Sequence, residues 1–167
     1  MKKIEVITGK IHTYQTLKPF LNVCRFKGSK IVFTNGCFDL VHLGHIDYLA
    51  RAADMGNILI VGVNTDSSVS RIKGPGRPVN SETTRSHVLA SLLFVNAVIL
   101  FDEPTPYELI KFIEPDVLVK GADWKKEDIV GYDIVKQNGG SVETIEYLDG
   151  YSTTGLVQKI LSYNQVK

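Results

Sequence analysis

The chain has 167 residues, which is about the length of one domain. Apolar residues make up 44% of it and charged residues 22%, a composition typical of a globular protein rather than a disordered one. Nineteen basic residues balance 18 acidic ones, and this formal net charge of +1 argues against a dedicated nucleic-acid-binding protein.

No segment is apolar enough to predict a membrane span or a leader. The longest apolar stretch, 88–101, is shorter than the roughly 18 residues that a span needs. The first five residues lack the apolar core of a signal peptide. The two cysteines, Cys24 and Cys37, show no metal-type spacing. We therefore expect a reduced, cytoplasmic protein that does not associate with membranes.

From residue 30 onward, strand-like and helix-like segments alternate. Short β-branched apolar runs predict strands over 30–34, 57–63, 97–101, 117–120 and 141–145. Helical spacing and capping signals predict helices over 44–54, 83–93, 105–114, 132–138 and 152–163. The third of these helices begins with a capping box in which Thr105 is the N-cap. Residues 65–80 are polar and carry two Gly and two Pro, which predicts a long loop. The alternation predicts an α/β fold, a Rossmann-like doubly wound, mainly parallel five-stranded sheet with helices on both faces.

The loop after the first predicted strand carries a candidate phosphate site. In doubly wound sheets, ligands bind outside the carboxyl ends of the strands. Gly36 allows a turn there, and Gly44 leaves space for a flat ligand near the backbone. His42 and His45 flank Gly44 at the start of a helix, whose free N–H groups attract anions. Two alternatives are a metal site built from Asp39, His42 and His45, and histidines with no role in binding.

These residues resemble the H-x-G-H signature of the nucleotidylyltransferase superfamily, in its cytidylyltransferase-like branch. Further segments resemble motifs of the same family, and they are 62–66, 71–80, 116–123 and 150–154. Together they look most like the adenylyltransferase domain of the bacterial ADP-heptose synthesis enzyme. The resemblance covers residue 10 to the end, and the departures are at Ala122, Trp124 and Tyr151.

The resemblance implies one nucleotidylyltransferase domain over 1–167, with an N-terminal lead-in over 1–28 and a catalytic core over 29–167. The bifunctional enzymes of this family also carry a sugar kinase, for which this chain is too short, so we expect a separate heptose kinase as pathway partner. Relatives also suggest a homodimer.

The implied reaction is attack by a sugar 1-phosphate on the α-phosphorus of ATP, with Mg²⁺ bridging the phosphates. The sugar would be D-glycero-D-manno-heptose 1-phosphate, and the ADP-heptose would serve lipopolysaccharide core or related glycan synthesis. The nucleophile is already an anion near neutral pH, so we expect neither a strong general base nor a covalent intermediate. One alternative is CMP transfer from CTP to glycerol 3-phosphate or a similar alcohol phosphate. Another is a nucleotide-binding module without catalysis, because doubly wound folds host both.

The resemblance assigns catalytic roles to His42, His45 and Lys73. Residues expected to bind the nucleotide and its phosphates are Thr34, Asn35, Gly36, Phe38, Asp39, Gly44, Asn64, Lys120, Gly121, Asp123, Ser152, Thr153 and Thr154. Candidate substrate contacts are Arg71, Arg77, Arg85 and Trp124. We expect no direct metal ligand, although Asp39 could reach Mg²⁺ through a water.

Four residues near the site can also be interpreted from the sequence alone. Lys73 and Arg71 could be solvated charges in a loop. Lys120 ends an apolar strand, where a charge needs a partner such as a phosphate or Asp123. Cys37 lies beside the site, but no general base adjoins it in sequence, so we expect no nucleophilic role for it.

Overall fold

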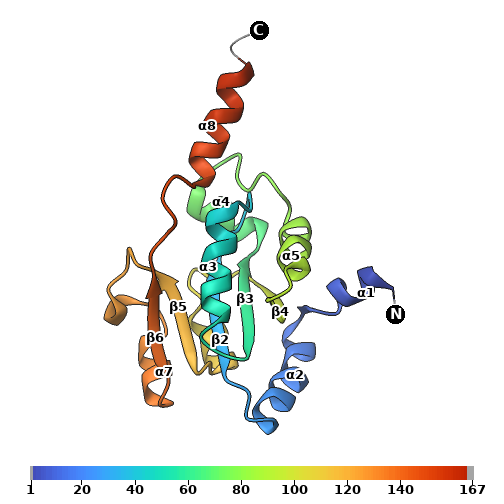
Figure 1. Cartoon of the computed structure of the whole chain (residues 1–167), viewed down its shortest axis with the longest axis vertical. Coiled ribbons are helices and arrows are strands. Elements are labelled where there is room, and N and C mark those ends of the chain that lie inside the picture. The colour runs from blue at the N-terminus through green and yellow to red at the C-terminus, as the bar shows by residue number, and fades with distance from the viewer. Residues whose placement is uncertain (1, 165–167) are drawn as a thin grey trace.

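A computed structural model describes residues 2–164 of the chain (Figure 1). Within these residues the strands form a six-stranded sheet in the order β1-β4-β3-β2-β5-β6, and every neighbouring pair is parallel. The strands are β1 (Ile11–His12), β2 (Ile31–Gly36), β3 (Ile58–Asn64), β4 (Ala97–Phe101), β5 (Val117–Gly121) and β6 (Ser141–Ile145). The predicted doubly wound α/β fold is confirmed, and β1 is the strand that the sequence did not predict.

Helices cover both faces of the sheet (Figure 1). They are α1 (Lys3–Thr8), α2 (Tyr14–Phe26), α3 (Leu43–Ala53), α4 (Asp66–Lys73), α5 (Glu82–Ser91), α6 (Tyr107–Ile113), α7 (Tyr132–Gln137) and α8 (Thr153–Asn164). Buried side chains of α2, α6 and α7 pack with Phe33 and Ile60 in one apolar core. Those of α3 and α5 pack with Val32 and Val61 in a second. Neighbouring residues of β2 and β3 thus serve opposite cores, as the alternation of side chains along a strand requires.

The prediction of a long loop over 65–80 is wrong for the first half of this segment, where α4 forms. Thr65 caps this helix by accepting a hydrogen bond from the Ser68 N–H at 3.2 Å. Val69 is buried and Gly74 ends the helix with φ of 89°. The cap, the buried Val69 side chain and the ion pair between Asp66 and Arg85 together order this polar segment.

The predicted capping box at Thr105 is also wrong. The helix begins one residue later, at Tyr107, with Pro106 as the N-cap and no side chain capping it. The Pro106 carbonyl accepts the first helical hydrogen bond, from the Ile110 N–H at 2.8 Å. Thr105 is consequently left exposed on the loop before α6.

The order of the strands places a crevice between β2 and β5. The chain runs outward from β2 through β3 to β4, and then crosses to β5 and β6 on the other side. The loops after β2 and β5 therefore leave the sheet toward opposite faces, and such a point is where ligands bind in open α/β sheets.

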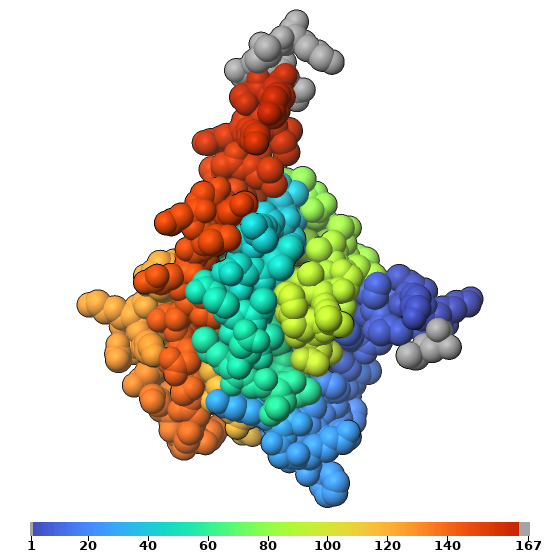
Figure 2. Space-filling model, viewed as in Figure 1, coloured from blue at the N-terminus to red at the C-terminus, as the bar shows by residue number. Residues whose placement is uncertain are grey.

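Helix α8 projects from the body of the molecule (Figures 1 and 2). Its side chains from Thr153 to Tyr163 are all at least partly exposed, so none belongs to either core. Ser152 caps it by accepting a hydrogen bond from the Gly155 N–H at 3.0 Å, which agrees with the predicted helix start. None of the helices within residues 2–164 has both the length and the apolar character needed to cross a membrane.

Candidate active site

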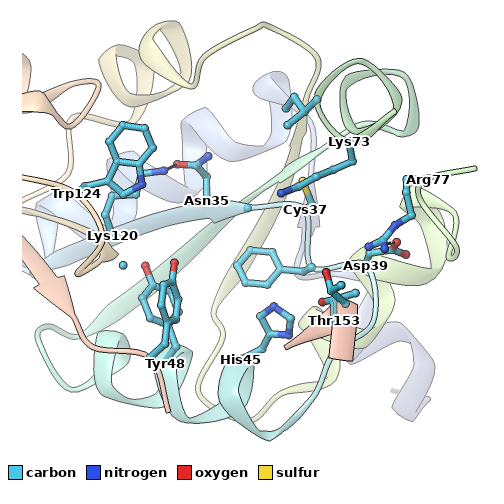
Figure 3. A pocket seen from close by; sticks show the side chains of 16 residues that line it. Asn35, Cys37, Asp39, His45, Tyr48, Lys73, Arg77, Lys120, Trp124 and Thr153 are labelled. Atoms are coloured by element: carbon cyan, nitrogen blue, oxygen red, sulfur yellow. Dashed lines mark hydrogen bonds and ion pairs between the residues drawn. The ribbon is translucent and has the colours of Figure 1, made fainter. Parts of the chain in front are cut away.

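A cavity of about 520 Å³ opens at the carboxyl ends of β2 and β5 (Figure 3). The predicted site residues that line it are Asn35, Gly36, Phe38, Asp39, His45, Lys73, Arg77, Lys120, Gly121, Trp124, Thr153 and Thr154. Cys37, Tyr48, Ile72 and Tyr147 complete the lining. Segments far apart in the sequence thus contribute to one concave site.

The loop after β2 is held in shape by Phe38 and Asp39. Phe38 has a left-handed backbone with φ of 48°, and its buried ring lies over Gly36, where a Cβ atom would come within 3.0 Å of it. Only glycine leaves room for this ring, so Gly36 is needed for packing as well as for the turn.

Asp39 fastens this loop to the segment after α4. Its buried carboxylate accepts hydrogen bonds from the backbone N–H groups of Val79 and Asn80 at 2.8–2.9 Å. It also pairs with Arg77 at 2.8 Å. Both carboxylate oxygens are therefore engaged within the protein, so Asp39 acts as a structural anchor.

His42 and His45 lie stacked at the start of α3, with ring centroids 3.9 Å apart. His42 is the N-cap residue of α3. The His45 Nδ1 accepts a hydrogen bond from the His42 backbone N–H at 3.4 Å, which places the imidazole proton on Nε2. The His45 ring lines the cavity, whereas His42 lies behind it and has a buried Nδ1 without a partner among the described residues.

The electrostatics of this pair favour neutral rings. Burial, with the neighbouring His42 as a second cause, lowers the pKa of His45 to about 4. Burial also lowers the pKa of His42. His45 is therefore an uncharged hydrogen-bond donor at neutral pH, suited to a phosphate oxygen.

The space beside Gly44 is filled by protein. A Cβ atom there would lie 3.1 Å from the Tyr151 Cβ and 3.2 Å from the His42 ring. We expected Gly44 to leave space for a flat ligand, but protein atoms occupy that space. Its missing side chain instead lets His42 and Tyr151 approach the first turn of α3.

Arg85 does not contact the cavity, so its expected role as a substrate contact is wrong. Its side chain is 1% exposed, and its guanidinium donates to the carbonyls of Asn80, Cys37 and Asn64 at 2.6–3.1 Å. It also pairs with Asp66 at 2.8 Å. A single buried side chain thus ties together the loop after β2, the end of β3 and the start of α5.

The other basic side chains of this region differ in whether they line the cavity. Lys73, on the last turn of α4, points into the cavity and forms no hydrogen bond or ion pair within residues 2–164 (Figure 3). Arg77 also lines the cavity, beside Asp39. Arg71 lies outside it and pairs with Asp102 at 3.1 Å. Lys73 and Arg77 therefore join Lys120 as the cations that line the cavity.

Two further predicted site residues, Thr34 and Asn64, do not line the cavity but form hydrogen bonds with other residues. The buried Thr34 hydroxyl bonds the Tyr48 hydroxyl at 2.8 Å, and the Asn64 amide donates to Ser68 at 3.0 Å. Asp123 and Ser152 are not part of the lining, although the residues next to Ser152, Thr153 and Thr154, are.

Tyr48 and Tyr147 are lining residues that the sequence did not reveal. A Cβ atom at Gly121 would meet the Tyr147 hydroxyl, so the absence of a side chain at Gly121 lets the half-exposed Tyr147 ring lie against the end of β5. Burial raises the pKa of both tyrosines, which are therefore protonated at neutral pH.

Metal-ligating side chains do not cluster in the described part of the chain. No group of three or more His, Cys, Asp or Glu within residues 2–164 is arranged to hold a metal ion. The alternative of a metal site built from Asp39, His42 and His45 is therefore not supported.

Cys37 gives the first testable prediction. Burial raises the pKa of its thiol, and the Sγ atom lies 3.9 Å from the Asn64 Oδ1. A protonated thiol is a poor nucleophile. We expect Cys37→Ala and Cys37→Ser to keep kcat within about tenfold of the wild-type value, which corresponds to about 1.4 kcal/mol of barrier. Steady-state kinetics will check this, and a loss of several thousandfold in a folded variant would restore a covalent mechanism.

Comparisons with known proteins show which family this chain resembles. The family model described as Cytidylyltransferase-like matches residues 33–158, a range that includes every lining residue. The chain is 49% identical over 153 residues to the bifunctional protein HldE of Syntrophotalea carbinolica, covering 92% of this chain and 31% of that protein. It is 53% identical over 140 residues to bifunctional protein HldE of Campylobacter jejuni subsp. doylei, covering 84% and 30%. The chain thus spans about a third of the length of these curated relatives.

A solved structure has a fold similar to that of this chain. The lipopolysaccharide core biosynthesis protein from Thermoplasma volcanium superposes with a TM-score of 0.61 at 27% identity, covering 75% of this chain and all of that one. Because the family model matches most of the chain, from within β2 to the middle of α8, the chain belongs to the cytidylyltransferase-like family.

Proposed function

We propose that this chain transfers AMP from ATP to a sugar 1-phosphate, D-glycero-D-manno-heptose 1-phosphate, and releases ADP-heptose and pyrophosphate. The observation that carries the proposal is the group of hydrogen-bond donors at one end of the cavity (Figure 3). There His45, Lys73 and Arg77 face Thr153 and Thr154 at the start of α8. The similarity to HldE proteins over most of the chain supports the choice of sugar.

In the proposed reaction, an oxygen of the sugar 1-phosphate forms a bond to the α-phosphorus of ATP. The bond from that phosphorus to the α,β-bridging oxygen breaks, and pyrophosphate leaves with the electron pair. No proton needs to be removed from the nucleophile. The protein therefore contributes positioning and charge stabilisation. The His45 Nε2–H donates to an α-phosphate oxygen, and Lys73 offsets the negative charge that builds up between the two substrates.

Mg²⁺ enters this proposal as part of the nucleotide substrate. Both oxygens of Asp39 are engaged by Val79, Asn80 and Arg77, so the site offers no free carboxylate pair for a resident ion. An ion that keeps its waters and binds ATP phosphates needs few protein ligands. We propose that MgATP binds as a unit, with Thr153 and Thr154 beside its β- and γ-phosphates.

The pathway setting is also part of the proposal. A kinase reaction on the sugar must supply the 1-phosphate, and the nucleotide sugar would serve lipopolysaccharide core or related glycan synthesis. ATP and two free cysteines fit a reducing, cytoplasmic setting.

The substrate pair gives the second prediction. Purified protein with Mg²⁺, ATP and D-glycero-D-manno-heptose 1-phosphate should release pyrophosphate and form ADP-heptose, which chromatography detects. CTP with glycerol 3-phosphate should be a poor pair. Faster turnover of the CTP pair would overturn the heptose assignment. Absence of turnover with both pairs, despite measurable ATP binding, would favour a binding module without catalysis.

A further inference from the structure

The first turn of α8 lines the active-site cavity, yet no hydrogen bond fastens it there. Thr153 and Thr154 belong to the lining. Within residues 2–164, no hydrogen bond or ion pair joins the segment 148–164 to the rest of the chain, and those that it makes lie within α8 and its cap. The side chains of α8 belong to neither apolar core. The position of this turn therefore depends on packing contacts near its first residue.

The segment that leads from β6 to α8, residues 146–152, runs alongside α3 (Figure 1). At its start, Arg51 of α3 donates a hydrogen bond to the Glu146 carbonyl. Near its end, Tyr151 lies against the first turn of α3, where a Cβ atom at Gly44 would come within 3.1 Å of the Tyr151 Cβ. The contact between Tyr151 and Gly44 is thus the one that lies next to α8.

Tyr151 also extends the stack of histidine rings. Its ring is inclined by 26° to the His42 ring, with centroids 6.4 Å apart. The His42 ring is inclined by 25° to that of His45, with centroids 3.9 Å apart. Aromatic rings in such offset stacks attract one another. The three rings form a row from the half-exposed Tyr151 to His45 in the cavity, so a displacement of Tyr151 reaches His45 through His42.

The ring and the Cβ atom of Tyr151 make these contacts, and its hydroxyl does not. The hydroxyl forms no hydrogen bond within residues 2–164, whereas the ring faces His42 and the Cβ atom faces Gly44. Tyr151 is also a position at which the chain departs from the motifs of its family. The family resemblance therefore assigns it no role, and its contacts must indicate one.

We propose that Tyr151 is a positioning residue, which holds the start of α8 against the H-x-G-H loop so that Thr153, Thr154 and His45 form one phosphate-binding surface. Tyr151 is not among the residues that line the cavity, so it acts on the substrate through other side chains. The inference rests on the proposed function, in which the α-phosphate of ATP lies at His45 and the β- and γ-phosphates lie beside α8.

Tyr151→Ala should impair both catalysis and the binding of the triphosphate. We expect kcat to fall about 10–100-fold, because a small misplacement of reacting groups can cost about 100-fold. The dissociation constant of ATP should rise about tenfold, as expected when a hydrogen bond to a charged group weakens. That of AMP, which lacks the β- and γ-phosphates, should change less than about threefold. The KM of heptose 1-phosphate should stay near the wild-type value. Steady-state kinetics and calorimetry provide these measurements.

Two matched variants separate the role of the ring from a general effect on α8. Tyr151→Phe keeps the ring and the Cβ atom, so its kcat and ATP affinity should match those of the wild type. Tyr163→Ala removes an exposed tyrosine from the far end of α8 and should also leave both unchanged. Since Tyr151 belongs to neither core, melting curves should show that all three variants fold. Equal losses in Tyr151→Ala and Tyr163→Ala would contradict the proposal.

The ring-nitrogen NMR resonances of His45 report its orientation directly. In the wild type, the bond from the His42 backbone N–H to Nδ1 places the proton on Nε2. In Tyr151→Ala these resonances should move toward the average of the two neutral tautomers, whereas in Tyr151→Phe they should not move.

The NMR spectra and ATP calorimetry need no acceptor substrate. They therefore test Tyr151 even if the wild-type enzyme does not turn over heptose 1-phosphate, a result that would count against the proposed function alone. Unchanged His45 resonances together with wild-type ATP affinity in Tyr151→Ala would overturn the role of Tyr151, even in an active enzyme.

Discussion

His45→Ala is expected to lower kcat by about 10²–10³-fold, the usual cost of removing one preorganised donor to a developing charge. The ring is held by the His42 backbone N–H, by stacking on His42 and by edge contact with Phe38 at 5.5 Å between centroids. The Nε2–H is thereby fixed before substrate arrives. Because its pKa is about 4, the ring stays neutral and keeps this donor throughout the range from pH 6 to pH 8.

The same substitution should affect binding and folding less than rate. ATP affinity should fall less than kcat if the contact strengthens in the transition state. The free energy of unfolding should change within the usual 0.5–3 kcal/mol, because the ring is only partly buried. His42→Ala should lower kcat less than His45→Ala, because the His42 ring does not line the cavity and acts on it by stacking on His45.

The measurements are kcat, the ATP dissociation constant and a melting curve for each variant. His87→Ala is the matched control, since His87 lies on α5 outside the cavity. Parent-like turnover in His42→Ala and His45→Ala, with normal melting and ATP binding, would remove the H-x-G-H loop from the catalytic centre.

Arg85→Met should lower the free energy of unfolding by about 3 kcal/mol or more, since each hydrogen-bond acceptor left without a donor inside the protein costs about 1–3 kcal/mol. The substitution leaves the carbonyls of Asn80, Cys37 and Asn64 without their donor. Arg85→Lys should restore only part of the loss, because one ammonium cannot reproduce a planar fork that reaches four oxygens.

Urea denaturation of the two variants will measure this effect. Arg71→Met is the control, because both side chains of the Arg71–Asp102 pair are exposed and such surface pairs contribute little to stability. Equal urea midpoints for Arg85→Met and Arg71→Met would show that the loop after β2, the end of β3 and the start of α5 hold together without the Arg85 guanidinium.

The sequence predicts the central strands well because each is a run of apolar residues buried on both faces. It misses β1 because two residues are too few to show a period; their partners on β4, Val98 and Ile99, define the strand. It misses α4 because most of that helix is polar. It also misses α1 and α2, and the order of β1 and α4 comes in part from contacts distant in sequence.

The residues of the site also fall into those that the sequence reveals and those that it does not. His45, Lys73 and Asp39 are visible in the sequence because they belong to short motifs beside strand ends. Tyr48 lies three residues after His45, so helical spacing could have placed it on the same face. Tyr147 lies two residues after the end of β6, which is a weaker signal. The role of Arg85 depends on carbonyl groups from three segments, and no local pattern encodes their convergence.

The affinity of the site for a nucleotide should depend on whether helix α8 is formed. A 12-residue helix is only marginally stable in water without packing, and this one buries no side chain from Thr153 to Tyr163. Its first turn nevertheless lines the cavity. Apparent affinity falls in proportion to the fraction of molecules in which that turn is formed. Any molecule that covers the apolar side of α8 would therefore tighten nucleotide binding without touching the nucleotide.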